Sequence, residues 1–321
     1  MSGNDGVPLV FNHLTLGQRV VFGTGLATEH LIHEIQRLGA RRVMVITSAR
    51  DASTGLRLVP CDCVSVRWTE VAQHVPVELA DRARGAAQEG QADLLVAIGG
   101  GSAIGLGKAI ALTSHLPLIA VPTTYAGSEA TDMWGITENH IKTTGTAPHV
   151  LPATVVYDSE LFTNLPLEIS VSSGINASAH CVDSLWAPRA DPINQALALE
   201  GARALATALP GIVEDPADRS AREQALDGCY LEAVSFASAG SGLHHKICHT
   251  LGGAFNLPHA QTHAVVLPHV LALNAPGAPV ASARLADALA QTRTHNNHST
   301  HEDRTTDQST NKPRHPPRRR R

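Results

Sequence analysis

The sequence predicts an α/β part built on a parallel sheet, followed by an all-helical part. Up to about residue 160, short apolar runs typical of buried strands alternate with helical periods, as in successive βαβ units. After about residue 165 the periods are helical and strand signals vanish. Hydrophobic residues make up 43% of the chain but aromatic residues only 3%, so the core must consist of Ala, Val, Leu and Ile, which suits buried parallel strands.

The first part contains five predicted strands. They lie at Arg19–Phe22, Arg42–Thr47, Val64–Val66, Asp93–Ile98 and Leu118–Val121. After the first strand, Thr28 can cap a helix that buries Leu31 and ends at Gly39. Further helices follow the second strand, extend from Pro76 to Gly90, and begin after the fourth strand.

The second part contains five predicted helices, and the two parts join near Asp158–Pro166. The helical periods cover residues 167–187, 193–209, 217–239, 242–252 and 261–273, and residues 281–290 continue as an amphipathic helix. We therefore expect one domain over residues 1–160 and a second over residues 161–290.

Residues 291–321 differ in composition from everything before them. They contain no aliphatic residue, not even Ala, and carry eight Arg or Lys against three acids. One interpretation is a disordered basic tail that binds nucleic acid or another polyanion. The other, which we favour, is out-of-frame coding sequence that replaced a native C-terminus, because the helix at 281–290 stops abruptly. The rest of the chain has a net charge of −9, which argues against nucleic acid as the main partner.

Cysteine usage indicates a reducing compartment. The chain has five scattered cysteines and no secretory signal, so we expect a cytoplasmic protein. The pair Cys61 and Cys63 is too isolated to indicate a metal site. No uninterrupted apolar run reaches about 18 residues, so no membrane span is expected.

A glycine-rich loop, Gly99-Gly100-Gly101-Ser102, separates the fourth strand from the helix that follows it. Glycines let a backbone approach a phosphate, Ser102 can cap the helix, and the helix N-terminus adds partial positive charge. The pattern is neither Gly-x-Gly-x-x-Gly nor a Walker loop, and a tight turn is the alternative. The strand before it and the helix after it favour a nucleotide site.

Two other loops can contribute to that site. After the fifth strand, the hydroxyls of Thr123, Thr124 and Ser128 can donate to a ribose, phosphate or carboxylate, although a Ser/Thr-rich turn is an equally good interpretation. After the second strand, the segment ending in Ser48 lacks the acid that usually binds the adenosine ribose, and Arg50 could accept a 2′-phosphate. We therefore expect both NADH and NADPH to bind.

Histidines with helical spacing point to one shared cavity. His245 and His249 are four residues apart, as are Asn176 and His180, and helix breakers can return His259 to the same place. Three imidazoles can hold Zn²⁺, whereas Fe²⁺ favours imidazoles plus a carboxylate, and Asn176 is a neutral amide. Because free imidazoles titrate near neutral pH, we expect the cavity to be cationic toward an entering anion.

These motifs together resemble the iron-containing alcohol dehydrogenase family, whose fold is dehydroquinate synthase-like. The resemblance covers about residues 8–290. Within the family the chain is most similar to the maleylacetate reductases. The segments that carry this similarity are Val121–Glu129, Ile141–Thr144 and Ser173–Asp183.

The resemblance implies a Rossmann-like dinucleotide-binding domain, a helical catalytic domain and a cleft between them. Metal-dependent members hold their ion with one Asp and three His, at positions that correspond to Asn176, His180, His245 and His259. The asparagine is shared with the maleylacetate reductases, so we expect catalysis without a metal. An ion, if bound, would use the three histidines of this set.

The implied reaction is reduction of the C=C bond of the dicarboxylate maleylacetate to 3-oxoadipate, with NADH as the first choice of cofactor. We expect His245 and Lys246 near the substrate, His249 as hydrogen-bonding support and Lys142 on a loop that faces the cleft. The cavity would be lined by Tyr125, Asn176, His180 and His259. By contrast, His244, His263 and His269 are expected to be core or helix-surface residues.

Two other functional classes stay open from the sequence. A metal-dependent alcohol or polyol dehydrogenase would bind one ion per chain and lose activity with it. A misfolded or polyanion-binding product would owe its behaviour to residues 291–321. The family often forms homodimers, and pairing through an N-terminal edge strand is one way to build them.

Overall fold

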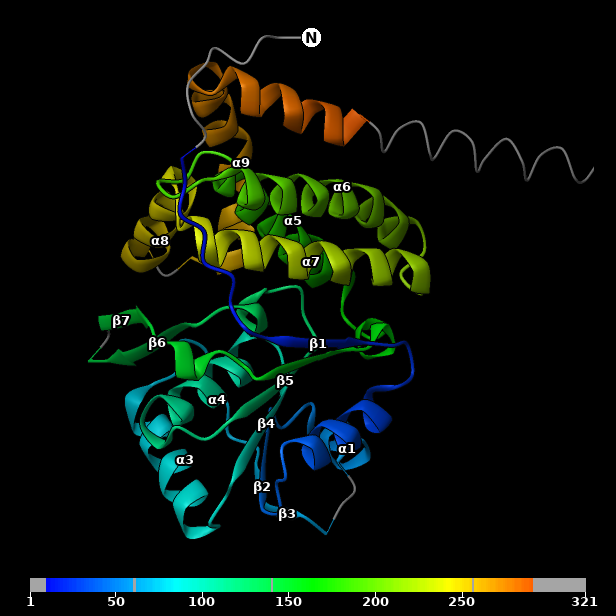
Figure 1. Cartoon of the computed structure of the whole chain (residues 1–321), viewed down its shortest axis with the longest axis vertical. Coiled ribbons are helices and arrows are strands. Elements are labelled where there is room, and N and C mark those ends of the chain that lie inside the picture. The colour runs from blue at the N-terminus through cyan, green and yellow to red at the C-terminus, as the bar shows by residue number, and fades with distance from the viewer. Residues whose placement is uncertain (1–9, 60–61, 140, 256, 291–321) are drawn as a thin grey trace, which may run out of the picture.

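The computed structural model describes residues 10–59, 62–139, 141–255 and 257–290. The predictions about Cys61 and about residues 291–321 lie outside these ranges. The fold has a parallel sheet flanked by helices, with a layer of helices packed beyond one edge of the sheet (Figure 1). The predicted fold class is therefore confirmed.

Six parallel strands form the sheet in the order β1-β8-β5-β4-β2-β3. Their bounds are β1 Arg19–Phe22, β2 Val43–Thr47, β3 Val64–Trp68, β4 Leu94–Gly99, β5 Leu118–Pro122 and β8 Thr154–Tyr157. A separate antiparallel hairpin consists of β6 (Met133–Glu138) and β7 (Ile141–Thr146). The sequence prediction missed β8 and the hairpin. The hairpin strands are largely exposed and rich in Thr and Gly, so they lack an apolar pattern.

Helices cover both faces of the sheet. Alternate residues of β4 point to opposite sides: Leu95 packs in the core with α3 and α4, and Leu94 packs in the core with α1 and α2. The bounds are α1 Ala27–Arg37, α2 Ala52–Leu58, α3 Val77–Glu89 and α4 Gly101–Ser114. This two-sided burial explains why the central strands are continuous apolar runs.

The cap of α1 differs from the prediction. Thr28 lies inside the helix. The N-cap residue is Leu26, whose side chain makes no capping hydrogen bond. Instead Asp158, which follows β8, accepts hydrogen bonds from the backbone N–H groups of Gly25 (2.8 Å) and Ala27 (3.1 Å). A carboxylate more than 130 residues away in the sequence thus satisfies this helix N-terminus, which no local pattern could indicate.

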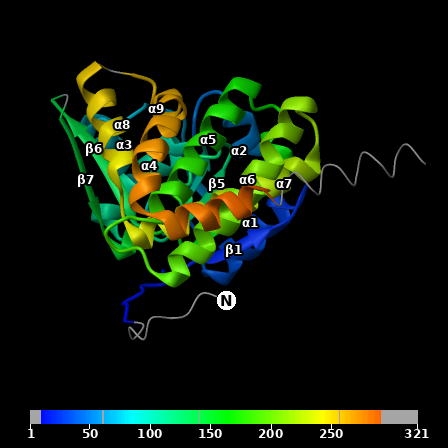
Figure 2. The same ribbon diagram turned by 90° about the horizontal axis from the view of Figure 1, so that it is seen from above.

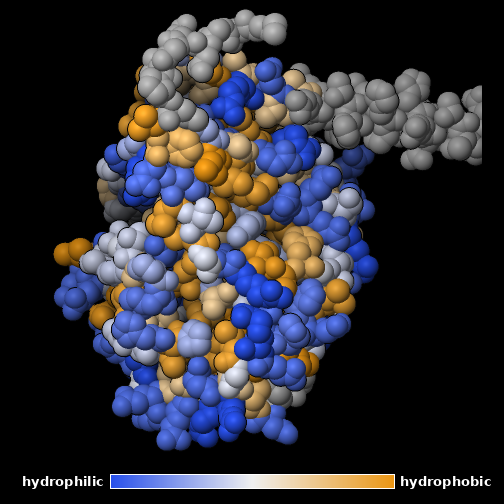
Figure 3. All heavy atoms as spheres, viewed as in Figure 1, coloured by the Kyte–Doolittle hydropathy of each residue, from blue (hydrophilic) through white to orange (hydrophobic). Residues whose placement is uncertain are grey.

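The helical part contains α5 to α9 and a further helical segment. Their bounds are α5 Leu167–Ser184, α6 Pro192–Glu214, α7 Arg219–Ala239, α8 Leu243–Phe255 and α9 His259–Asn274, followed by helical residues 279–290. Among the described residues, one helix, α6, is long enough and apolar enough to cross a membrane, judged by length and composition alone. It packs against α5 and α7 in the structure, and the face in Figure 3 mixes polar and apolar residues.

Helices α6 and α7 approach each other through glycines. A Cβ on Gly228 would lie 3.1 Å from the carbonyl oxygen of Gly201 and 2.8 Å from Cγ of Leu205. The absence of side chains at this crossing lets the two backbones touch and makes α6 and α7 a tightly packed pair.

The amino-terminal segment, residues 10–18, lies across both parts before it enters β1 (Figures 1 and 2). His13 Nδ1 is 2.9 Å from Asp191 Oδ2 at the start of α6. Gln18 Nε2 donates to the carbonyl oxygens of Glu129 (2.8 Å) and Pro152 (2.9 Å) in the α/β part. The segment therefore links the helical part to the sheet.

Candidate active site

The glycine loop lies at the carboxyl end of β4, where open α/β sheets bind ligands. Gly99 has φ 147°, a conformation that L-residues with side chains rarely adopt. Gly100 is the N-cap of α4, so Ser102 lies inside the helix and its predicted capping role is wrong. The first N–H groups of α4 have no acceptor one turn earlier in the helix, an arrangement that can bind an anion.

The hydroxyl loop meets the glycine loop. A Cβ on Gly100 would lie only 3.1 Å from Oγ1 of Thr124, so these two predicted residues are adjacent. Oγ1 of Thr123 is buried and has no hydrogen-bond partner. Such an orphan hydroxyl beside a phosphate-type loop fits a bound nucleotide.

A buried lysine that the sequence analysis missed anchors this loop. Nζ of Lys108, in α4, donates to the carbonyl oxygens of Ser128 (2.5 Å), Thr131 (2.8 Å) and Met133 (2.9 Å). Burial lowers the pKa of Lys108 to about 7, although Glu129 and Asp132 oppose the shift. The available signal was a lysine in the middle of an otherwise apolar helix.

An acid does lie beside the end of β2, contrary to the sequence expectation. Ser48 Oγ donates to Oδ2 of Asp51 at 2.6 Å, which folds this carboxylate back toward the sheet. The same Oδ2 would be 3.6 Å from a Cβ on Gly99. The prediction considered only the residues directly after the strand, and the turn into α2 brings Asp51 to the glycine loop.

The predicted histidines converge from three helices. His180 comes from α5, His245 and His249 from α8, and His259 from the start of α9. The ring centroids are 4.5 Å apart for His180 and His245, and 5.8 Å apart for His249 and His259. The four histidines therefore lie close together, as the sequence predicts.

Two further histidines complete this imidazole cluster. His244 and His263 are fully buried, and His244 Nε2 lies 3.0 Å from His263 Nδ1. The His263 ring centroid is 4.6 Å from that of His245 and 4.4 Å from that of His259. Both are core residues, as expected, but they also belong to the cluster.

Two buried carboxyl groups lie behind the cluster, and the sequence analysis missed both. Asp183 makes hydrogen bonds to the cluster, whereas the Glu232 carboxyl group lies close to it without a hydrogen-bond partner. Asp183 Oδ2 accepts hydrogen bonds from Nδ1 (2.7 Å) and the backbone N–H (3.2 Å) of His245. Glu232 Oε2 lies 2.5 Å from Nδ1 of His180. Nε2 of His245 is buried with no partner. The Asp183 contact therefore fixes which nitrogen of His245 is left for a ligand.

Burial disfavours the cationic imidazoles that the sequence predicts for a cavity with a bound anion. Burial lowers the pKa of His180 to about 4 and lowers that of His245, and partial desolvation beside the neighbouring imidazoles lowers the pKa of the exposed His259. These rings are therefore neutral at pH 7. The nearby cation is Lys142 of β7, which acts electrostatically on His249 and His259.

The two predicted lysines differ in position. Lys142 keeps exposed surface, and partial desolvation lowers its pKa. Lys246 is exposed on α8 one residue after His245, which turns it about 100° around the helix from that ring. In the described chain it makes no side-chain hydrogen bond or ion pair, so the geometry favours Lys142 over Lys246.

Tyr125 is not part of the imidazole cluster. Its side chain is fully buried in the core of the helical part and stacks on Phe162 with ring centroids 4.8 Å apart. Its hydroxyl accepts a hydrogen bond from the buried guanidinium of Arg222 (3.1 Å). The expectation that Tyr125 lines a ligand cavity is therefore wrong, because its side chain faces the core.

The residues that correspond to a metal site do not fit iron. Asn176 Oδ1 is buried without a partner, so a neutral amide occupies the position where a hard ion needs a carboxylate. In the described part of the chain, two histidine triads have ligand atoms within 4.8 Å of one another: His244, His245 and His263, and His249, His259 and His263. Neither triad contains His180 or Asn176.

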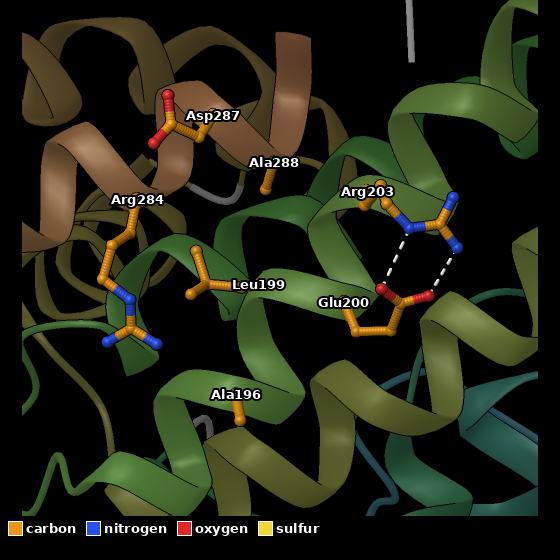
Figure 4. Close-up of a pocket in the computed structure, with 7 residues that line it drawn as sticks. All are labelled: Ala196, Leu199, Glu200, Arg203, Arg284, Asp287 and Ala288. Carbon is orange, nitrogen blue, oxygen red and sulfur yellow. Dashed lines mark hydrogen bonds and ion pairs between the residues drawn. The ribbon is translucent and has the colours of Figure 1, made fainter. Parts of the chain in front are cut away.

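A separate pocket of about 290 Å³ lies between α6 and residues 279–290 (Figure 4). It is lined by an ion pair of Glu200 and Arg203, with Arg284 and Asp287 on the other side. No residue of the imidazole cluster or the glycine loop lines it.

Comparison with known proteins identifies the family. A sequence profile described as "Iron-containing alcohol dehydrogenase" matches residues 17–159, and one described as "Fe-containing alcohol dehydrogenase family, C-terminal" matches residues 170–310. The chain belongs to the iron-containing alcohol dehydrogenase family. The resemblance deduced from the sequence is thereby confirmed.

Individual relatives share most of the chain. A maleylacetate reductase of Burkholderia cepacia is 48% identical over 274 residues, which cover 84% of this chain and 77% of that protein. The structure of a maleylacetate reductase from Agrobacterium tumefaciens has a TM-score of 0.85 and 42% identity, covering 88% and 81%. An iron-containing alcohol dehydrogenase from Corynebacterium glutamicum has a TM-score of 0.87 and 56% identity, covering 90% and 83%.

Proposed function

We propose that this chain is a maleylacetate reductase, an oxidoreductase that uses NADH to reduce the C=C bond of maleylacetate to 3-oxoadipate. The observation that carries the proposal is the amide of Asn176 in place of a metal-binding carboxylate, one helical turn before His180, whose ring stacks on the carboxylate-held His245. The identity to maleylacetate reductases over most of the chain supports it.

The α/β part is proposed to bind the cofactor. The N-terminus of α4 receives the pyrophosphate, with Thr123 and Thr124 beside it. Asp51 favours a ribose with free hydroxyl groups and repels a 2′-phosphate, so we place NADH before NADPH. We also propose a division into domains at 1–160 and 161–290, with the substrate between them.

The substrate is a dianion with a ketone conjugated to its C=C bond. Lys142 supplies a fixed positive charge for one carboxylate. The second carboxylate of the substrate, bound beside the imidazole cluster, favours protonation of an adjacent imidazole. Asp183 stabilises that proton on His245 by accepting from Nδ1, which makes Nε2–H a donor toward the substrate.

The nicotinamide cofactor, when bound at the α4 N-terminus, would supply a hydride to the alkene carbon β to the ketone. Negative charge then builds on the ketone oxygen as an enolate, and a hydrogen bond from His245 Nε2 stabilises it. A protonated histidine or lysine of the site then gives a proton to the carbon next to the ketone, which converts the enolate to the saturated ketone and completes the reduction. His249, on the next turn of α8, is proposed to support the substrate by hydrogen bonding.

An assay with excess chelator tests the proposal. Purified protein is mixed with NADH and maleylacetate, and loss of NADH absorbance is followed. Turnover that persists in chelator, and that falls about 100-fold or more in His245→Gln, would support it. His269→Asn is the matched control, because His269 is exposed on α9 and belongs to neither triad. Activity that returns only after a metal is added would favour an alcohol dehydrogenase.

The site of action is proposed to be the cytoplasm, and the assembly a homodimer. β1 is an edge strand of the sheet and pairs only with β8 among the described strands, so it is the strand we propose to pair with a second copy. Light scattering coupled to size exclusion would give the mass in solution. A monomer at micromolar concentration would contradict the dimer.

A further inference from the structure

Three histidines of the cluster can form a metal site that differs from the one the family resemblance implies. Ligand atoms of His249, His259 and His263 lie within 4.8 Å of one another. His249 comes from α8 and the other two from α9, and these helices lie side by side (Figure 2). Two of the three residues, His259 and His263, are four apart on one helix, a spacing that places both rings on the same face.

The buried member of this triad has one nitrogen to offer. Nδ1 of His263 is engaged by Nε2 of His244 at 3.0 Å. Nε2 of His263 is buried and has no hydrogen-bond partner. A contact that holds one ring nitrogen and leaves the other without a partner is the arrangement found behind metal-bound histidines.

The second triad, of His244, His245 and His263, is a poorer candidate. All three residues are buried, and two of their nitrogens already bond each other. Nδ1 of His245 is taken by Asp183. In contrast, His249 and His259 are exposed, so an ion can reach them from solvent and keep a water ligand.

We propose that His249, His259 and His263 bind a borderline divalent cation of the zinc class. Three neutral nitrogens without a carboxylate suit Zn²⁺ or Co²⁺ better than Fe²⁺ or Mg²⁺. Tetrahedral coordination at about 2.0–2.1 Å needs nitrogens about 3.4 Å apart. The exposed rings of His249 and His259 can close that gap by side-chain rotation.

Binding is tested directly on the chelator-stripped, full-length protein. Titration with ZnCl₂ is followed by calorimetry, and titration with CoCl₂ by the visible absorption of tetrahedral Co²⁺. We expect one ion per chain, and loss of both signals in His249→Asn and in His263→Asn. His249 is exposed, so its variant stays informative if His263→Asn does not fold. His269 lies on α9 like His263 but outside the triad, so the His269→Asn variant should bind both ions as the unchanged protein does.

Two results would overturn the proposal. One is the absence of a saturable signal with either ion. The other is binding that survives both His249→Asn and His263→Asn but is lost in His180→Asn, because the ion would then occupy the ligand set implied by the family resemblance. Neither readout depends on turnover, so the outcome is independent of whether maleylacetate is the substrate.

Discussion

At the scale of residues, Asp183 determines the chemistry of His245 by contacting one of its two ring nitrogens. An isolated imidazole exchanges its proton between two nitrogens, but Asp183 holds Nδ1–H and leaves Nε2 without a partner. Asp183 also accepts the backbone N–H of Gly242 at 3.0 Å, so it fixes the start of α8 as well as the ring. The carboxylate thus sets both the tautomer and the position of the helix.

Replacing Asp183 with Asn should lower kcat far more than it raises KM. The amide holds the ring less firmly and cannot stabilise a protonated His245, so we expect kcat to fall about 10- to 100-fold. Steady-state kinetics with maleylacetate would measure the split. Asp227→Asn, an exposed acid on α7, is the control. An unchanged kcat in a folded Asp183→Asn variant would refute the role of this carboxylate.

Asp51 should determine the choice between NADH and NADPH. Its removal eliminates the repulsion of a 2′-phosphate, so Asp51→Asn is expected to raise the NADPH/NADH ratio of kcat/KM about tenfold. Asp81→Asn removes an exposed charge from α3 and should leave the ratio unchanged. If the ratio stays constant in both variants, the adenosine ribose does not lie against Asp51.

At the scale of elements, the crossing of α6 and α7 depends on the missing side chains of Gly201 and Gly228. Gly228→Ala would force a methyl group into Leu205 and the carbonyl oxygen of Gly201. We expect a loss of about 1–3 kcal/mol in the free energy of unfolding.

The matched change is Gly85→Ala in α3, where a Cβ would meet nothing within 4 Å. That variant should gain about 0.5–1 kcal/mol, because Ala is the better helix former. Urea unfolding followed by circular dichroism measures both. Equal effects at the two positions would show that the crossing does not require glycine.

Many of the helices and strands could be predicted from the sequence. Strands β2, β4 and β5 and helices α5 to α9 follow from apolar periodicity, and the glycine loop follows from its place between a strand and a helix. The residues that hold the site from behind did not follow, because Asp183, Glu232 and Lys108 act through contacts made only after folding. Asp183 lies three residues after His180 on α5, so its helical spacing was a usable signal.

For the whole molecule, Glu34 links α1 to two strands of the sheet. Its fully buried carboxylate accepts hydrogen bonds from Thr154 (2.7 Å), Arg37 (2.7 Å) and Arg19 (2.9 Å). Burial alone would raise the pKa of Glu34, but these hydrogen bonds outweigh it and lower the pKa from 4.5 to about 2. The ionised form therefore stabilises the fold.

The pH dependence of stability should reveal this link. Because the folded pKa is the lower one, the contribution is complete above pH 4.5 and is lost as the pH falls toward 2. Glu34→Gln should cost about 3 kcal/mol at pH 7 and about 1 kcal/mol at pH 3. Glu29→Gln, an exposed acid on the same helix, should cost little at either pH. A Glu34→Gln deficit that does not shrink in acid would contradict the assignment.

The amino-terminal segment sets a mechanical limit on the molecule. One end is attached near Asp191 and the other near Pro152, and the backbone makes five residue-to-residue steps from His13 to Gln18 between these attachments. A stretched chain of that length spans about 18 Å at most. If the helical layer hinges away from the sheet, the opening is limited by the length of this segment unless one of the two attachments breaks. The segment therefore restricts the relative movement of the two parts of the enzyme.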